Sequence, residues 1–115
     1  MKTSNFKIAG QDPNAVAICR GVPRGWKGRR YVALAPSWVL VKTKLPEDQW
    51  KARYYEEVLS KLNPRQVLAD LGPDAVMLCW EAPGETCHRR LVAEWLEEVT
   101  GVEIREVLPW EVPQN

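Results

Sequence analysis

The sequence predicts an α/β fold, a small three-layer domain with a mostly parallel sheet flanked by helices. Two short apolar runs, residues 15–19 and 75–80, have the length and character of buried strands. Helical patterns separate these runs, and residues 102–107 alternate as a last strand. Because strands that alternate with helices are joined by crossovers, we expect the strands to run parallel in one sheet.

Three helices are expected between and after these strands. The first covers residues 46–62, because aromatic and aliphatic side chains recur there at every fourth position. A short second helix covers residues 64–71 and begins with Asn63 as its cap and proline at the first helical position. The third covers residues 86–100, presents one apolar face and ends at a glycine.

The remaining segments have weaker patterns. Residues 38–41 fit either a helix or a strand, and residues 20–31, broken by glycines, fit a loop. The chain is predicted to be one domain, residues 1–115, with a core at about 3–107 and a loose tail at 108–115. Four tryptophans fall on apolar faces or beside strands and are interpreted as core residues: Trp38, Trp50, Trp80 and Trp95.

Length and composition indicate a globular protein. The chain has 115 residues, of which 45% are hydrophobic and 27% charged, which argues against disorder. No apolar run approaches the roughly 18 residues that a membrane-spanning helix needs, and no signal sequence is apparent, so we expect no membrane partner. Three cysteines cannot all pair, which favours reduced thiols and a cytoplasmic location. The sequence does not indicate an oligomeric state.

The charge is unevenly distributed along the chain. Residues 1–44 hold nine Lys and Arg against one acidic residue, whereas residues 45–115 hold seven against fourteen. A basic loop interleaved with Trp26 and Tyr31 could contact the phosphates of a nucleic acid while its aromatic rings stack on bases. The alternative is a solvated loop whose tryptophan packs on the core. The basic residues of the loop are Arg20, Arg24, Lys27, Arg29 and Arg30, and the last four are the predicted nucleic-acid-binding residues.

Cys87, His88 and Arg89 lie at the predicted start of the last helix, after the strand that ends with Cys79 and Glu81. In open parallel sheets, ligands bind beyond the carboxyl ends of the strands. The first turn of a helix has unpaired N–H groups that favour an anion, and an arginine there can hold phosphate with two hydrogen bonds. The same field favours a thiolate nucleophile.

The predicted roles in this turn are therefore specific. Either Cys87 serves as the nucleophile or Glu81 serves as a general base, and His88 assists proton transfer. Arg89 and Arg20 bind the anionic substrate. In a purely structural alternative, the arginine pairs with a surface carboxylate and the buried cysteine is inert.

A metal site is the other alternative for these side chains. Cys79, Cys87 and His88, with Cys19, offer four ligands that zinc prefers. The spacing contains no paired Cys-x-x-Cys arrangement, and adjacent cysteine and histidine rarely bind one ion together. We therefore predict no metal and no cofactor.

The segment at 78–89, Leu-Cys-Trp-Glu-Ala-Pro-Gly-Glu-Thr-Cys-His-Arg, resembles the signature of the domain of unknown function 488 family, in its short phage and bacterial type. That signature is a buried strand ending in Cys-x-Glu, a Pro/Gly-containing loop, and Cys-His-Arg opening a helix. Further similarity covers residues 3–107, in the segments Thr3-Ser4-Asn5-Phe6, Ile18-Cys19-Arg20-Gly21-Val22-Pro23, Leu34-Ala35-Pro36-Ser37 and Tyr54-Tyr55.

The resemblance implies an α/β fold and a shared polar pocket but no defined activity. It adds Cys79 and Ser4 to the predicted substrate-binding residues. Position 19 is cysteine where relatives are expected to carry serine or aspartate, so no common catalytic role is predicted for Cys19.

Three functions remain open from the sequence. The first is a small enzyme acting on a phosphate-bearing substrate, a nucleotide or nucleic acid, through the Cys-His-Arg turn. The second is a non-catalytic module that binds nucleotides or nucleic acid. The third is a protein-interaction domain of a phage or mobile element, in which the motif is structural.

Overall fold

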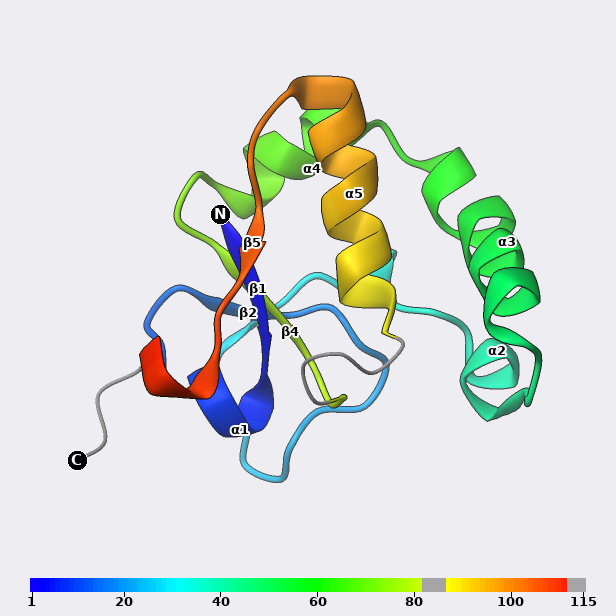
Figure 1. The fold of residues 1–115 in the computed structure, drawn as a ribbon. Coiled ribbons are helices and arrows are strands. Elements are labelled where there is room, and N and C mark those ends of the chain that lie inside the picture. Colours follow the sequence, from blue (N-terminus) through cyan, green and yellow to red (C-terminus); the bar gives the residue numbers. More distant parts are fainter. Residues whose placement is uncertain (82–86, 112–115) are drawn as a thin grey trace.

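The computed structural model describes residues 1–81 and 87–111. In this part of the chain, five parallel strands form one sheet in the order β3-β2-β4-β1-β5 (Figure 1). The strands are β1 (Lys2–Asn5), β2 (Ala15–Ala17), β3 (Arg29–Arg30), β4 (Val76–Cys79) and β5 (Arg105–Glu106). The predicted α/β class and parallel sheet are therefore confirmed.

Strand β1 was not expected, because its four residues are mostly polar. It nevertheless lies between β4 and β5, with Asn5 in register with Cys79 and Thr3 with Glu106. The side chains of Thr3, Ser4 and Asn5 are buried and hydrogen-bonded, so each polar group has a partner away from water. Strand β3 lies within the segment predicted as a loop and pairs with β2 at the opposite edge.

The three predicted helices are present, and the structure adds short helical segments that the sequence did not indicate, among them α1. Residues 38–41 are helical, because the Ser37 hydroxyl accepts a hydrogen bond from the N–H of Leu40 and caps the turn. The expected helix at 46–62 ends at Glu57, and a 3₁₀ turn follows at Leu59–Lys61. The α-helices are α1 (Phe6–Ala9), α2 (Trp38–Lys42), α3 (Glu47–Glu57), α4 (Pro64–Leu71) and α5 (His88–Thr100), with further 3₁₀ turns at Val32–Leu34 and Pro109–Glu111.

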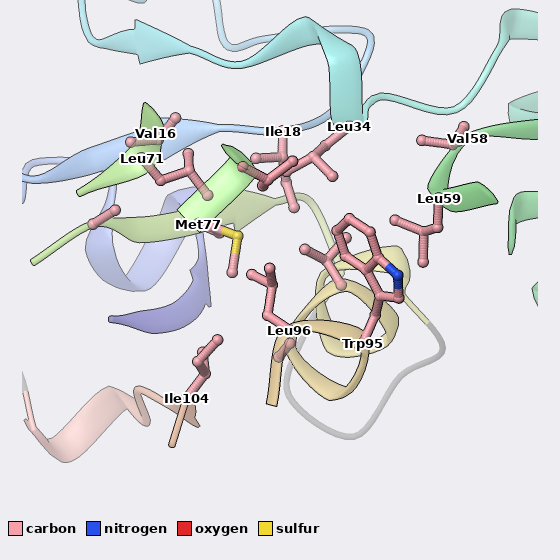
Figure 2. Packing of buried hydrophobic residues seen from close by; sticks show 14 of the residues in the cluster. Val16, Ile18, Leu34, Val58, Leu59, Leu71, Met77, Trp95, Leu96 and Ile104 are labelled. Carbon is pink, nitrogen blue, oxygen red and sulfur yellow. The ribbon is translucent and has the colours of Figure 1, made fainter. Parts of the chain in front are cut away.

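Hydrophobic side chains cover both faces of the sheet. Met77 on β4 points into the larger core, among Val16, Ile18, Leu71 and Leu96 (Figure 2). Its neighbours in sequence, Val76 and Leu78, point to the other face, where they pack with Ala9 and Ala15 beneath α1. Because side chains alternate along β4, the strand packs against hydrophobic residues on both faces of the sheet. The domain therefore has three layers, with the sheet in the middle.

The end of β4 and the beginning of α5 determine where the Cys-His-Arg turn lies. Strand β4 ends at Cys79, and α5 begins immediately after Cys87, which is its N-cap residue. In the described residues, no helix is long and apolar enough to cross a membrane.

Candidate functional site

A pocket of about 600 Å³ lies beyond the carboxyl ends of β2 and β4, which are neighbours in the sheet. This volume is within the range of sites for small molecules. Sulfur, imidazole, carboxylate, guanidinium and indole groups all reach its wall. Its chemically informative lining residues are Cys19, Arg20, Trp38, Trp50, Cys79, Trp80, Glu81, Cys87 and His88.

Cys79 and Cys87 are joined in a disulfide, which differs from the expectation of three reduced thiols. Cys19 is the free cysteine, and its side chain packs with the other two in one small cluster. The Cys19 thiol donates a hydrogen bond to the carbonyl of Gly21 at 2.9 Å. Burial raises the pKa of Cys19 to about 11, so this thiol stays protonated at neutral pH.

His88 is buried at the first position of α5, and the contacts of its two ring nitrogens indicate which nitrogen carries the proton. Nε2 lies 2.7 Å from the carbonyl oxygen of Ile18. Because a carbonyl only accepts, we assign the ring proton to Nε2, which leaves the Nδ1 lone pair free. Nδ1 lies 3.8 Å from the sulfur of Cys87. The ring also packs edge-on against Tyr54, at 5.4 Å between centroids.

Burial lowers the pKa of His88 to about 4, although its hydrogen bond to Ile18 acts in the opposite direction. The imidazole is therefore neutral at pH 7. A neutral histidine beside a cysteine can accept the thiol proton, which is the first requirement for a nucleophilic sulfur.

This neutral histidine predicts how stability depends on pH. Between pH 6.5 and 4 the unfolded chain protonates His88 while the folded chain does not, so stability falls as the pH falls. The expected loss is about 3 kcal/mol across this window, compared with a His88→Gln variant, which lacks the titrating group. Urea unfolding at a series of pH values measures the difference. Identical slopes for the two proteins would show that His88 is not buried as a neutral ring.

Arg89 does not line the pocket, contrary to its predicted role as an anion ligand. Its guanidinium is 1% exposed and pairs with the carboxylate of Glu106 on β5, with Nε–Oε1 at 3.0 Å and Nη2–Oε2 at 2.6 Å. Its Nη1 donates to the sulfur of Cys79 at 2.9 Å. The positive charge is thus directed at an internal carboxylate and an internal sulfur, and Arg89 positions these groups instead of facing the pocket.

The carboxylate of Glu106 accepts a hydrogen bond from a second side chain as well. Thr3 donates to it at 2.6 Å, and Arg90 in turn donates to Thr3 at 2.8 Å. Burial alone would raise the pKa of Glu106, but hydrogen bonds from Arg89 and Thr3 and the nearby positive charges outweigh burial and lower it. The carboxylate therefore stays ionised and holds Arg89 in place.

Arg20 and Glu81 both line the pocket, and their predicted roles as anion ligand and general base stay predictions. Arg20 donates Nε to the carbonyl of Pro36 and Nη2 to that of Ala35, at 3.1 and 3.3 Å. Its Nη1 has no hydrogen-bond partner among the residues that the structure describes. The backbone carbonyl of Glu81 accepts a hydrogen bond from the side chain of Asn5 at 3.2 Å.

Ser4, in contrast, is not a lining residue. It is fully buried on β1, and its hydroxyl donates to the carbonyl of Val107 at 3.3 Å. Its predicted substrate contact has no support in this geometry, because the side chain points toward the chain that follows β5. Asn5, one residue further on, is the positioning residue that sequence reasoning missed.

Apart from Arg20, the basic side chains of the loop do not line the pocket. Arg29 donates to the carbonyls of Asp70 and Leu71 on α4, and Arg30 donates to the carbonyl of Arg20. Arg24 and Lys27 are exposed and line a separate hollow that also contains Asp12. Trp26 is half-buried against Phe6, at 5.1 Å between centroids, as the structural alternative expected. The predicted nucleic-acid-binding side chains therefore lie outside the lining of this pocket, and their role in binding nucleic acid stays a prediction.

Three tryptophans interpreted as core residues form walls of the pocket instead. Trp38 and Trp80 are 53% and 55% exposed, and Trp50 is half-buried. Trp80 is held by a hydrogen bond from Nε1 to the carbonyl of Gly21 at 2.9 Å. Trp95 is buried in the core as predicted, and Trp50 packs against that core from the pocket wall. Pattern reasoning failed for these residues because a wall of an open pocket and a core position have the same apolar flanks.

Among the described residues, Cys79, Cys87 and His88 bring together one group of ligand atoms that a metal ion could use, all within 4.8 Å of one another. While the disulfide is closed, neither sulfur is available as a thiolate. The absence of a metal therefore stays a prediction from the sequence.

Comparison with known proteins supplies the family. The profile described as "Active DUF488-N3 subclade" matches residues 11–100, which include β2, β4, all of α5 and the whole Cys-His-Arg turn. No curated protein and no solved structure matches the chain. Because the match covers well over half of the sequence, the chain belongs to the domain of unknown function 488 (DUF488) family.

Proposed function

We propose that this domain is a small cysteine-dependent enzyme that binds a phosphate-bearing small molecule, most simply a nucleotide, and attacks it with the sulfur of Cys87. The single observation that carries the proposal is the lone pair of the neutral His88, directed at the Cys87 sulfur on the wall of the pocket. The matched subclade is described as active, which agrees with an enzyme.

The chemical step requires the reduced form. His88 Nδ1 accepts the Cys87 proton, the sulfur attacks an electrophilic atom of the substrate, and the leaving group departs with its electron pair and receives the proton from His88. Glu81, at the pocket wall, then activates the water that releases the covalent intermediate. We accordingly propose a reducing compartment, the cytoplasm, as the place of action.

The pocket wall favours a nucleotide over a long nucleic acid. Exposed indole faces of Trp38 and Trp80 offer stacking surfaces for a planar base. Among the described residues, Arg20 is the arginine on the wall and its Nη1 makes no hydrogen bond to the others, so it can donate to a phosphate oxygen. The other predicted phosphate contacts lie on the loop outside the pocket, where a longer strand would have to reach them.

The test is turnover of a panel of nucleoside mono-, di- and triphosphates by the reduced protein, followed by chromatography. We expect Cys87→Ser to lower the rate by about 10³-fold or more, because it removes the nucleophile. Cys19→Ser is the matched control and should keep the activity. Equal turnover by Cys87→Ser and the parent protein would refute the proposed mechanism.

A second candidate, a non-catalytic nucleotide-binding module, is favoured by the closed disulfide, because that state has no free nucleophile in the pocket. It predicts that the oxidised protein binds nucleotides and that no redox condition produces turnover. In either case Arg20→Gln should weaken binding about tenfold or more, as measured by calorimetry, because a charged hydrogen bond to phosphate is lost.

A further inference from the structure

We infer that Cys79 and Cys87 form a working dithiol–disulfide couple, which exchanges with low-molecular-weight disulfides that enter the pocket. The inference rests on the proposed function in one respect, because Cys87 is the reacting sulfur in both. It goes further in assigning a second activity, a second reacting residue and a chemical class of reactant.

The two sulfurs of the couple lie together at the pocket. The two sulfurs come from the end of β4 and the N-cap of α5, eight residues apart in the chain, and they are joined in the structure. Both residues also line the open pocket. Cys79 is 1% exposed and Cys87 6% exposed, so a small reagent has to enter this pocket to reach the disulfide.

The two sulfurs have different partners. Cys87 lies beside Nδ1 of His88, which accepts a proton. Cys79 receives an N–H from Arg89, a permanent cation with no acceptor of its own. The surroundings therefore favour proton removal at Cys87 and negative charge at Cys79.

These partners assign a role to each sulfur. Cys87, at the opening of α5, is the sulfur that attacks an external disulfide. Cys79, held by Arg89, is the resolving thiolate, and it is also the leaving group when an external thiol attacks the closed disulfide at Cys87. A good leaving thiolate accelerates that return step.

The balanced reaction has two steps. The Cys87 thiolate attacks one sulfur of R–S–S–R, which forms a Cys87–S–S–R mixed disulfide and releases one RS⁻. The Cys79 thiolate then attacks the Cys87 sulfur, which closes the Cys79–Cys87 disulfide and releases the second RS⁻. Two electrons pass from the protein dithiol to the external disulfide, and the two thiol protons go to the released thiolates or to solvent.

Closure of the disulfide also removes the nucleophile on which the proposed enzyme depends. The couple would thus make nucleotide turnover sensitive to the thiol–disulfide balance. Cys19 lies in the same cluster but is excluded from the exchange, since its proton is held by the carbonyl of Gly21. It provides an internal control of the same residue type.

The experiment uses the reduced protein and 2-hydroxyethyl disulfide, with intact-mass and peptide analysis after acid quenching. The parent protein and Cys19→Ser should lose two hydrogen atoms and carry no adduct. Cys79→Ser should retain one hydroxyethylthio adduct, located on Cys87, because the resolving thiol is missing. Cys87→Ser should react more slowly by about tenfold or more.

The results that would overturn the inference are equally specific. They are an adduct on Cys19, a parent protein that stops at the mixed disulfide, or a Cys87→Ser variant that reacts as fast as the parent. Circular dichroism of each variant checks that it is folded. If a Cys79 or Cys87 variant fails to fold, the folded Cys19→Ser protein still tests the couple, because it should lose two hydrogen atoms and carry no adduct. The exchange assay contains no nucleotide and the turnover assay contains no disulfide reagent, so either proposal can fail alone.

Discussion

Replacing Arg89 with methionine should lower the free energy of unfolding by about 3–5 kcal/mol, the cost of breaking a buried ion pair from one side. Arg89 is 1% exposed and makes its hydrogen bonds to Glu106 and to the sulfur of Cys79. Methionine fills much of the same volume but leaves the carboxylate of Glu106 without its cation. Urea unfolding at pH 7 under reducing conditions measures the change.

Arg53→Met is the matched control, because Arg53 pairs with Glu57 on the exposed face of α3. An exposed pair of this kind contributes less than about 1 kcal/mol. The double variant Arg89→Met with Glu106→Gln should recover part of the lost stability, since it leaves no unpaired charge. A loss at Arg89 no larger than that at Arg53 would mean that the buried pair does not hold β5 against α5.

Arg89 also illustrates what the sequence could and could not reveal about the site. The Cys-His-Arg motif located the start of α5 and the edge of the sheet, and both are where the pattern placed them. The direction of the Arg89 side chain depends on Glu106, which lies 17 residues later on a two-residue strand. The sequence around an arginine at the start of a helix is the same whether its side chain faces a bound anion or a carboxylate of the protein. The local pattern therefore could not distinguish the two orientations of Arg89.

Strand β1 was not predicted for a related physical reason. Pattern reasoning finds strands by apolar alternation, and Thr3, Ser4 and Asn5 have none. These residues are stable inside the sheet because their partners come from distant parts of the chain, Glu106, Val107 and Glu81. Strands β2 and β4 were predictable because their burial is encoded locally, in their own apolar side chains.

The reactivity of the cysteines gives the second large expected effect. In the reduced protein at pH 7, iodoacetamide should alkylate Cys87 at least about 100-fold faster than Cys19. Burial raises the pKa of Cys19 to about 11, so only about one Cys19 thiol in 10⁴ is ionised at pH 7. Cys87 has the Nδ1 lone pair of a neutral histidine beside it. Timed quenching and peptide mapping give the rate at each cysteine separately.

His88→Phe should slow alkylation of Cys87 by about 10²-fold, because the ring remains but the proton acceptor is lost. Tyr54→Phe is the control for disturbed packing, since Tyr54 contacts the His88 ring while its hydroxyl bonds to the carbonyl of Leu34. That variant should keep a rate within a few-fold of the parent protein. If the two variants slow Cys87 equally, packing and not proton transfer governs the thiol, and the catalytic role of His88 is wrong. Cys87 labelling as slow as that of Cys19 would remove the nucleophile from the proposed enzyme altogether.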